Sequence, residues 1–442
     1  MQAGPAGLPG CIPAVHEEND FLRQKLSLGF LTAVLLGWSW LDGQPARPPS
    51  NAGCLACHGS AAAVEARSRI NETQFLSSVH KDLYCTACHA VQSGEAQTDV
   101  PHQKDIPDPD CTAVCHREDQ KAQPSLDPLF YPDSVHGRAY LERGVREVAR
   151  CWDCHGKHNI RSASDPESSV HRKNIPLMCS ACHEDMAVVV KYHIHSETPY
   201  QEYMKSVHGR ALFEKGLLQY AAVCTDCHGV HDIKGVGEPH LMAKDPKTCG
   251  RCHELIFGEY KESIHGRDTL AGNPDSPLCV DCHGEHGIVS PKDEGSPASK
   301  QNIPDTCSTC HARPEVMAKY GISEDKIGTF INSLHGIAVG FGYRAAANCA
   351  SCHGVHDIRP ASDPKSRVNP ANLRRTCGQA DCHPNMPEKI ASAKIHIGPD
   401  QKTSPALYYV QRVLLVFVLI LLGITVLWFI PGFIRKRILL KR

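Results

Sequence analysis

Apolar residues in this chain gather in two long runs, and only short helical patterns lie between them. The second run, 413–434, holds 22 residues without a charge, which is long enough to cross a bilayer. Between the runs, 200–212 and 330–334 place apolar residues at helical spacing, and loops rich in Pro, Gly, Ser and charge, such as 290–301, are expected on the outside. The pattern predicts a mainly α-helical domain with extensive loops, little regular secondary structure and a C-terminal transmembrane helix.

Charges around the two runs predict how the chain is oriented. A basic tail from Arg435 to Arg442 follows the second run, so the C-terminus is expected in the cytoplasm and the preceding domain outside. The first run, 26–41, follows Arg23 and Lys25 and is typical of an export signal, cleaved near Ala46, or of a retained anchor. We therefore divide the chain into 1–46, signal peptide or N-terminal anchor; 47–400, a periplasmic domain; and 401–442, linker, transmembrane helix and tail.

Cysteine and histidine then identify the chemistry. The 442 residues include 23 Cys and 27 His but only 6% aromatics, and the 47 basic and 48 acidic residues give no case for nucleic-acid binding. All cysteines except Cys11 form eleven close pairs, each followed directly by His. Nine pairs read CxxCH: Cys54/Cys57/His58, Cys85/Cys88/His89, Cys151/Cys154/His155, Cys179/Cys182/His183, Cys224/Cys227/His228, Cys249/Cys252/His253, Cys279/Cys282/His283, Cys307/Cys310/His311 and Cys349/Cys352/His353.

The two remaining pairs are stretched versions of the same motif. Cys111/Cys115/His116 reads CxxxCH and Cys377/Cys382/His383 reads CxxxxCH, for which we expect a break in the helix between Gly378 and Asp381. Disulfides and zinc ribbons are the alternatives, but neither needs a His after every pair. CxxCH is the signature of covalent c-type haem attachment, in which two thiols on one helical turn bond one haem edge and the His ligates the iron. The sequence therefore predicts eleven covalently attached haems c.

The motifs form a leader, at Cys54, and five repeats. Each repeat has a Ser-x-His element, a first motif that usually reads CHGxH at its end, a spacer of 20 to 25 residues and a second motif. We number them repeat 1 (78–116), repeat 2 (134–183), repeat 3 (206–253), repeat 4 (263–311) and repeat 5 (333–383). With about 40 residues per haem, the macrocycles are expected to supply most of the buried apolar surface.

Histidines outside the motifs are candidates for the sixth iron ligand. The Ser-x-His elements nominate His80, His136, His208, His265 and His335, and CHGxH nominates His158, His231, His286 and His356. Gln92 stands at the CHGxH position of repeat 1, so His102 is taken as its substitute, and His396 looks like a sixth Ser-x-His element. His171, His193, His195 and His240 are left over as alternatives.

Through these eleven motifs, over about 51–400, the chain resembles membrane-anchored multihaem c-type cytochromes of anaerobic respiration. The resemblance implies bis-histidine haems in close-packed chains that pass single electrons. It also implies attachment of the haems outside the cytoplasmic membrane. The chain departs from small tetrahaem quinol dehydrogenases in its haem number and its C-terminal anchor, which counts against direct quinol oxidation.

Three functions remain open at this point. The first is an electron-transfer protein, not an enzyme, that relays electrons from a membrane partner, quinone-reactive or a b-type cytochrome, to periplasmic redox proteins or extracellular acceptors. The partner is required because no His lies between Tyr408 and Arg442, so the anchor cannot hold a bis-His haem. The second is a reductase of a nitrogen or sulfur oxyanion with one open-site haem, expected at the leader haem or that of His383. The third is a polymerising cytochrome wire, against which the anchor argues.

Overall fold

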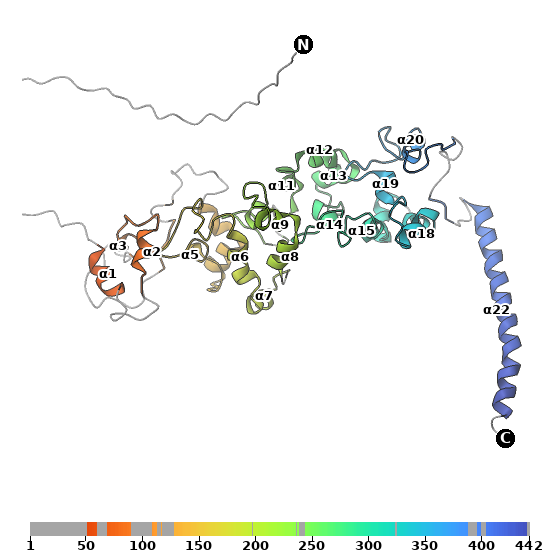
Figure 1. Ribbon diagram of the computed structural model, residues 1–442, viewed down its shortest axis with the longest axis horizontal. Coiled ribbons are helices and arrows are strands. Elements are labelled where there is room, and N and C mark those ends of the chain that lie inside the picture. Colours follow the sequence, from red (N-terminus) through yellow and green to blue (C-terminus); the bar gives the residue numbers. More distant parts are fainter. Residues whose placement is uncertain are drawn as a thin grey trace, which may run out of the picture. The chain divides into compact units, whose positions relative to one another are not determined.

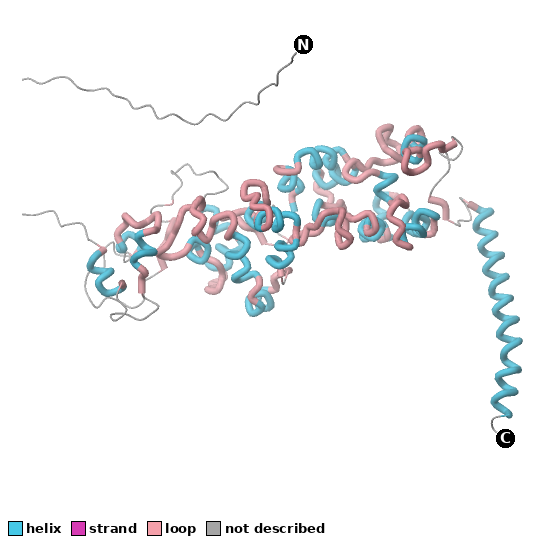
Figure 2. The backbone as a smooth tube through the Cα atoms, in the orientation of Figure 1, coloured by secondary structure: helices cyan, strands magenta, loops and turns pink. Residues whose placement is uncertain are grey.

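The computed structural model describes residues 51–59, 69–89, 108–112, 116, 128–196, 198–235, 237, 244–322, 325–387, 396–398 and 404–439. Every regular element in these ranges is a helix, and nearly all are short, as Figures 1 and 2 show. The exception is α22 (Pro405–Leu439), whose stretch Pro405–Ile430 contains an 18-residue window with a mean hydropathy of 3.2 and is long and apolar enough to cross a bilayer. The helical class and the C-terminal apolar helix are thus confirmed, while the predicted signal segment, 1–46, lies outside the described residues.

Repeats 2 to 5 share one order of elements. A leading helix is followed by a Ser-x-His helix, a first-motif helix and a second-motif helix. In repeats 2 to 5 the leading elements are η3 (Pro128–Asp133), α8 (Pro199–Lys205), α12 (Glu254–Glu262) and α17 (Asp325–Ile331). The Ser-x-His helices are α4 (Val135–Leu141), α9 (Val207–Phe213), α13 (Ile264–Leu270) and α18 (Leu334–Gly340). Each of these four packs against the leading element before it.

The motif helices are shorter and more variable. First motifs form α5 (Cys151–His155), α10 (Cys224–His228), α14 (Cys279–His283) and α19 (Cys349–His353). Second motifs fall in α6 (Ile175–His183), α11 (Pro246–Gly250), α15 (Ile303–His311) and α20 (Leu373–Cys377). Elsewhere lie α1 (Ala52–His58), α2 (Glu72–Leu76), α3 (Cys85–Cys88), α7 (Met186–Tyr192), α16 (Pro314–Met317) and η5 (Ala318–Tyr320). Helix α20 ends at Cys377 and the chain turns through Gly378, which confirms the break expected in CxxxxCH.

Serine and glycine explain how each Ser-x-His helix begins. The buried hydroxyl of Ser263 accepts a hydrogen bond from the Gly266 amide, 2.9 Å away, and so caps the helix that carries His265. A Cβ on Gly266 would collide with the Tyr260 carbonyl oxygen of the preceding helix. The same cap and the same close approach recur at Ser134/Gly137, Ser206/Gly209 and Ser333/Gly336. Repeat 1 has Lys81 at the glycine position, and its Ser-x-His element is a turn.

The serine caps also divide the helical patterns seen in the sequence. The apolar spacing over 200–212 belongs to two helices, α8 and α9, that meet at Ser206, and 330–334 is divided in the same way at Ser333. The backbone of Ser206 is extended, with φ −69° and ψ 164°, so one continuous helix through it is excluded. Within these patterns Tyr203, Leu212 and Phe330 are buried, whereas Leu334 is 86% exposed.

A second glycine ends each first-motif helix. Gly284 follows His283 with φ 80° and ψ 177°, a conformation that is essentially restricted to glycine. Gly156, Gly229 and Gly354 do the same in the other repeats, which accounts for the glycine of CHGxH. At the other end, the Asp281 carboxylate accepts a hydrogen bond of 2.6 Å from the Leu278 amide and so caps the helix start. The chain therefore turns sharply away just after the motif histidine.

Spacer loops are held by an internal clamp and are less exposed than the sequence suggests. The Asn302 side chain donates hydrogen bonds to the carbonyl oxygens of Glu294 and Ser296, at 2.9 and 3.0 Å. Asn174 and Asn372 make the equivalent contacts in repeats 2 and 5. Most residues of 290–301 are exposed, as predicted, but Ser296 and Ser299 are only 0% and 4% exposed. They turn inward because the clamp folds the loop back over its own backbone.

Consecutive repeats are joined by the backbone. In repeats 1 to 4 the donor is the backbone amide of the residue just before the Ser-x-His histidine. The acceptor is the carbonyl oxygen of an isoleucine in the next repeat, two residues after its CHGxH histidine. These bonds are 2.7 to 2.8 Å long and join Val79 to Ile160, Val135 to Ile233, Val207 to Ile288 and Ile264 to Ile358. Apolar packing is slight by comparison, since the buried core cluster consists of Ile175, Tyr203, Leu212, Ala221 and Val223. Protein side chains alone thus supply only a small core in the described part of the chain.

Candidate metal centres formed by paired histidines

Ten motif histidines each face a second histidine across a narrow gap. The ring centroids of every pair lie 6.0 to 6.3 Å apart, although the residues come from different elements. The pairs are His80–His116, His89–His158, His136–His183, His155–His231, His208–His253, His228–His286, His265–His311, His283–His356, His335–His383 and His353–His396.

This separation fits one metal ion between two imidazoles. A metal–imidazole bond is about 2 Å and a ring nitrogen lies about 1.1 Å from its centroid, so two ligands across one ion place their centroids about 6 Å apart. In the described ranges no three His, Cys, Asp or Glu side chains converge on a common point. Each pair therefore offers two protein ligands only, a donor set that suits a metal whose other positions are filled by a macrocycle.

Second motifs pair within their own repeat. Their histidines face the Ser-x-His histidine at the start of the same repeat: His116 with His80, His183 with His136, His253 with His208, His311 with His265 and His383 with His335. The spacer thus folds back so that the end of each repeat meets its beginning. The capped helices α4, α9, α13 and α18 hold the partner histidine in position in repeats 2 to 5.

First motifs pair with the repeat that follows. His89, His155, His228 and His283 face the CHGxH histidines His158, His231, His286 and His356 of the next repeat. In repeat 5, where no repeat follows, His353 faces His396. His396 therefore takes the place of a CHGxH histidine, and the interpretation of its segment as a sixth Ser-x-His element is wrong. The reason is that its partner belongs to a first motif.

The leader site is only partly described. Burial lowers the pKa of His89, and the nearby His58 is the second cause. His58 also contributes to the lowered pKa of His158, after burial, His89 and Lys157, so it lies close to both histidines. His102, the predicted substitute for the CHGxH histidine of repeat 1, lies outside the described residues, as do Gln92, Cys115 and the leftover His240. Nothing is described of the Cys57 side chain either. Of the other leftover histidines, His171, His193 and His195 form no such ring pair in the described ranges.

Burial favours the neutral form, which is the form that binds metal, in several of the paired imidazoles. It lowers the pKa of His136 and of His265 to about 4, with the facing His183 and His311 as the second cause. Burial likewise lowers the pKa of His228, His353 and His208. These side chains are available as ligands at neutral pH.

The cysteine thiols show which motifs are neighbours. A hydrogen bond between Cys111 and Cys151 raises the pKa of Cys111 and lowers that of Cys151 to about 7. Thiol pairs of the same kind join the second motif of one repeat to the first motif of the next at Cys179–Cys224, Cys249–Cys279 and Cys307–Cys349. In a haem protein these sulfurs are thioethers, so the contacts indicate the proximity of attachment segments.

Motifs are also adjacent within each repeat. In each first motif of repeats 2 to 5, burial is the main cause that raises the pKa of the second cysteine. A nearby thiol of the second motif in the same repeat is a further cause. These pairs are Cys154 with Cys182, Cys227 with Cys249, Cys282 with Cys310 and Cys352 with Cys377. Together with the thiol pairs between repeats, they place the attachment segments next to one another in sequence order from Cys111 to Cys377.

Two second cysteines, Cys252 and Cys382, lie outside the assigned helices. Helix α11 ends at Gly250 and α20 ends at Cys377, so both cysteines follow a helix end, and both side chains are exposed. Cys252 still lies on one helical turn with Cys249, because the His253 amide donates a hydrogen bond of 2.9 Å to the Cys249 carbonyl oxygen. Cys382 lies beyond the break, as the longer spacing of its motif predicts. Attachment of haem through these two thiols stays a prediction.

The position of Cys382 is nevertheless close to its motif partner. After burial, Cys382 is the second cause that raises the pKa of Cys377, and its Sγ donates a hydrogen bond of 3.8 Å to the Asp381 carboxylate. The stretched motif thus keeps its two thiols near each other although its helix is broken between them.

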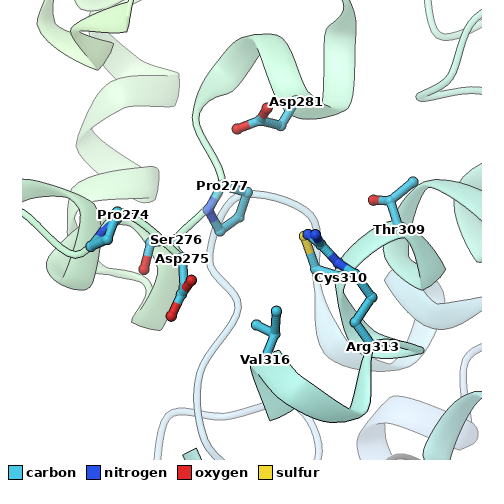
Figure 3. A pocket seen from close by; sticks show the side chains of 9 residues that line it. All are labelled: Pro274, Asp275, Ser276, Pro277, Asp281, Thr309, Cys310, Arg313 and Val316. Carbon is cyan, nitrogen blue, oxygen red and sulfur yellow. The ribbon is translucent and has the colours of Figure 1, made fainter. Parts of the chain in front are cut away.

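An open cavity of about 440 Å³ lies beside one attachment cysteine. It is bordered by the loop 274–277, Asp281 of α14, and Cys310, Arg313 and Val316. Figure 3 shows the Arg313 guanidinium beside the Cys310 sulfur, to which it donates a hydrogen bond of 3.3 Å. This space next to Cys310 is large enough for part of a macrocycle bonded to that sulfur.

Aromatic residues three positions before the capping serines were not singled out by sequence reasoning. The hydroxyls of Tyr131, Tyr203 and Tyr260 donate to the carbonyl oxygens of Ala149, Ala222 and Pro277, two residues before the first cysteine of each motif, at 2.7 to 2.8 Å. They link the Ser-x-His segment to the first motif. Aligning the repeats would have revealed them, since Phe330 occupies the same position in repeat 5.

In repeats 3 to 5 the residue just before this aromatic side chain faces a distal histidine. Glu202 and Glu259 lie near the Nδ1 atoms of His286 and His356, and the Thr329 hydroxyl lies near that of His396. The position is Phe130 in repeat 2, so the residue type is not constant and no common pattern in the sequence marks it.

Comparison of the chain with family models, with curated proteins and with solved structures found no match.

Proposed function

We propose that this chain is a membrane-anchored undecahaem c-type cytochrome that relays electrons from a membrane partner to periplasmic or extracellular acceptors in anaerobic respiration. The observation that carries the proposal is the set of ten histidine pairs with centroids 6.0 to 6.3 Å apart, each of which includes the histidine of a haem-attachment motif. Covalently bound haem would supply one-electron redox chemistry at each of these positions.

The protein's contribution is to fix and space the sites. Two cysteines of each motif would hold the macrocycle edge, and the paired histidines would fill both axial positions. The order of the motifs supports transfer between neighbours, because each motif from that of Cys151 to that of Cys349 lies next to the motif before it and the motif after it.

Full axial ligation favours a relay over a reductase. A reductase needs an iron with an open or displaceable position. At His383, one of the two places where such a site was expected, His335 stands opposite with a centroid distance of 6.0 Å. The reductase alternative is thereby narrowed to the leader haem of His58.

The membrane assignment rests on α22 and the charges around it. Tyr408 and Tyr409 lie at its start, and the guanidinium of Arg412 lies 5.3 Å from the ring centroid of Tyr408. Such aromatic and basic residues typically lie at a membrane interface. With the basic tail in the cytoplasm, the haem domain lies on the periplasmic side. A separate quinone-reactive or b-type cytochrome subunit supplies the electrons, because the anchor has no His.

The decisive experiment combines haem quantification per chain with low-temperature electron paramagnetic resonance of the oxidised protein. Eleven haems per chain, all low-spin, are expected. A stoichiometric high-spin signal that responds to nitrite or cyanide would contradict the relay and favour the reductase. A chain without covalent haem would overturn the proposal as a whole.

A further inference from the structure

The side chains behind the distal histidines differ between repeats in a way that bears on redox potential. The Nδ1 atom of His286 lies 3.5 Å from the Glu202 carboxylate, and that of His356 lies 3.9 Å from the Glu259 carboxylate. In repeat 5 the position is Thr329, whose hydroxyl lies 3.0 Å from Nδ1 of His396. These three residues come from equivalent places, one residue before Tyr203, Tyr260 and Phe330.

The fold brings each of these side chains to the next repeat's ligand. Glu202 lies on α8, just before the Ser-x-His helix of repeat 3. The backbone hydrogen bond from the Val207 amide to the Ile288 carbonyl oxygen holds repeat 4 against this segment. An added Cβ at Gly287, next to His286, would lie 3.7 Å from Cβ of Glu202, so the backbones approach closely there. The backbone hydrogen bond from the Ile264 amide to the Ile358 carbonyl oxygen likewise holds the segment of His356 against α12, which carries Glu259.

These side chains lie at Nδ1 of each imidazole, which leaves Nε2 as the nitrogen that would bind the metal. A carboxylate near the outer nitrogen makes the imidazole a stronger electron donor and stabilises the more positive, oxidised iron. A neutral hydroxyl such as that of Thr329 does this more weakly, and the two charges near His396, on Lys326 and Asp325, act in opposite directions. Because the carboxylates are partly exposed, at 46% for Glu202 and 58% for Glu259, solvent reduces the effect without removing it.

We propose that Glu202 and Glu259 tune the haems of His228/His286 and His283/His356 to lower potential than the haem of His353/His396, which Thr329 faces. This inference rests on the proposed function, since it requires haem at these pairs. The two carboxylates are positioning residues that act through the distal histidines. The haems along the relay then differ in reduction potential, with lower potentials at these sites in repeats 3 and 4 and a higher potential in repeat 5.

The test is a spectropotentiometric titration of the intact, haem-loaded protein with the variants Glu202→Gln and Glu259→Gln. In each variant, about one eleventh of the haem absorbance is expected to move to higher potential, and in the double variant about two elevenths. Glu262→Gln is the matched control, because it removes the same charge from an exposed position on the same helix as Glu259. It is expected to leave the titration curve unchanged.

Haem content and spin state, measured on the same samples, separate this inference from the proposed function. Eleven low-spin haems with unchanged titration curves in both variants would overturn the tuning role and leave the relay standing. An equal shift in Glu262→Gln would also overturn it, because the effect would then be one of net charge. Absence of covalent haem would overturn both. A converse variant, Thr329→Glu, is expected to move about one eleventh of the absorbance to lower potential.

Discussion

The imidazoles of His155 and His231 face each other with centroids 6.0 Å apart and an interplanar angle of 22°, although one belongs to repeat 2 and the other to repeat 3. Each repeat in this arrangement completes a site whose attachment cysteines belong to its predecessor. The backbone hydrogen bonds between repeats, such as that from the Val135 amide to the Ile233 carbonyl oxygen, hold the two contributing repeats together.

Replacing one distal histidine should therefore alter a haem of the preceding repeat. In His356→Ala, the haem attached at Cys279 and Cys282 is expected to lose one axial ligand, giving a high-spin signal of about one haem in eleven by electron paramagnetic resonance. The matched control is His195→Ala, which removes an exposed histidine that forms no ring pair in the described ranges. A high-spin signal of equal size in the control, or none in His356→Ala, would contradict the pairing.

The glycine of Ser-x-His-Gly should be needed for ligand placement. In Gly266→Ala, the new Cβ meets the Tyr260 carbonyl oxygen, so α13 must shift and His265 with it. We expect a loss of about 2 kcal/mol in the free energy of unfolding and partial loss of low-spin signal. Both are measured in a denaturant titration followed at the Soret band.

Gly258 in α12 provides the control for that substitution. It has no heavy atom within 4 Å of an added Cβ, so Gly258→Ala is expected to leave ligation intact and to stabilise its helix by up to about 1 kcal/mol. If the two alanine variants behaved alike, close approach of the backbone would not explain the glycine of the motif.

Tyr131 should make stability depend on alkaline pH. Burial raises the pKa of Tyr131 from 10.0 to about 12, so its hydroxyl keeps donating to the Ala149 carbonyl oxygen above the pH at which an unfolded chain ionises. A group whose pKa is raised on folding stabilises the protein below the unfolded value and loses that contribution as pH rises, here from 10 to about 12.

The variant Tyr131→Phe removes both the hydrogen bond and that pH dependence. We expect it to cost about 1 kcal/mol at neutral pH and to flatten the decline between pH 10 and 12, measured by denaturant titration at several pH values. Tyr220→Phe, at a side chain 83% exposed, should change neither. If the free energy of unfolding of Tyr131→Phe still declined unaltered between pH 10 and 12, the decline would come from other groups.

Removal of α22 should separate the two parts of the proposed function. A chain that ends before Ser404 is expected to leave the membrane fraction in low-salt washes, with its haem spectrum unchanged, and to lose reduction by quinol in membranes. Fractionation and anaerobic spectra check both. Retention of the shortened chain in membranes would indicate a second anchor.

The sequence allowed the helical class, the apolar C-terminal helix and the break after Cys377 to be predicted, because each depends on local pattern. It did not allow the partners within the histidine pairs to be predicted. The contact of His353 with His396 depends on how repeats stack, and no spacing within one repeat encodes it. The helix spacing over 200–212 misled for a local reason: apolar periodicity continues through Ser206, but its hydroxyl caps a new helix there.

The roles of Glu202, Glu259 and Thr329 were out of reach for a different reason. Their positions are recognisable only once the aromatic residues beside them are known to align between repeats. The position holds Phe130, Glu202, Glu259 and Thr329 in repeats 2 to 5, so it has no constant residue type. By contrast, the serine and both glycines are constrained by caps and by conformation, and so their pattern is visible in the sequence.

His396 has a consequence for the length of the array. It completes the last first-motif site in place of a CHGxH histidine from a further repeat, and so it closes a series that would otherwise need an additional member. The first motifs of the internal repeats all pair by the same rule, from His155 to His283, so these repeats occupy equivalent places in the array. The array is modular in this sense, and His396 supplies the partner for its last first motif.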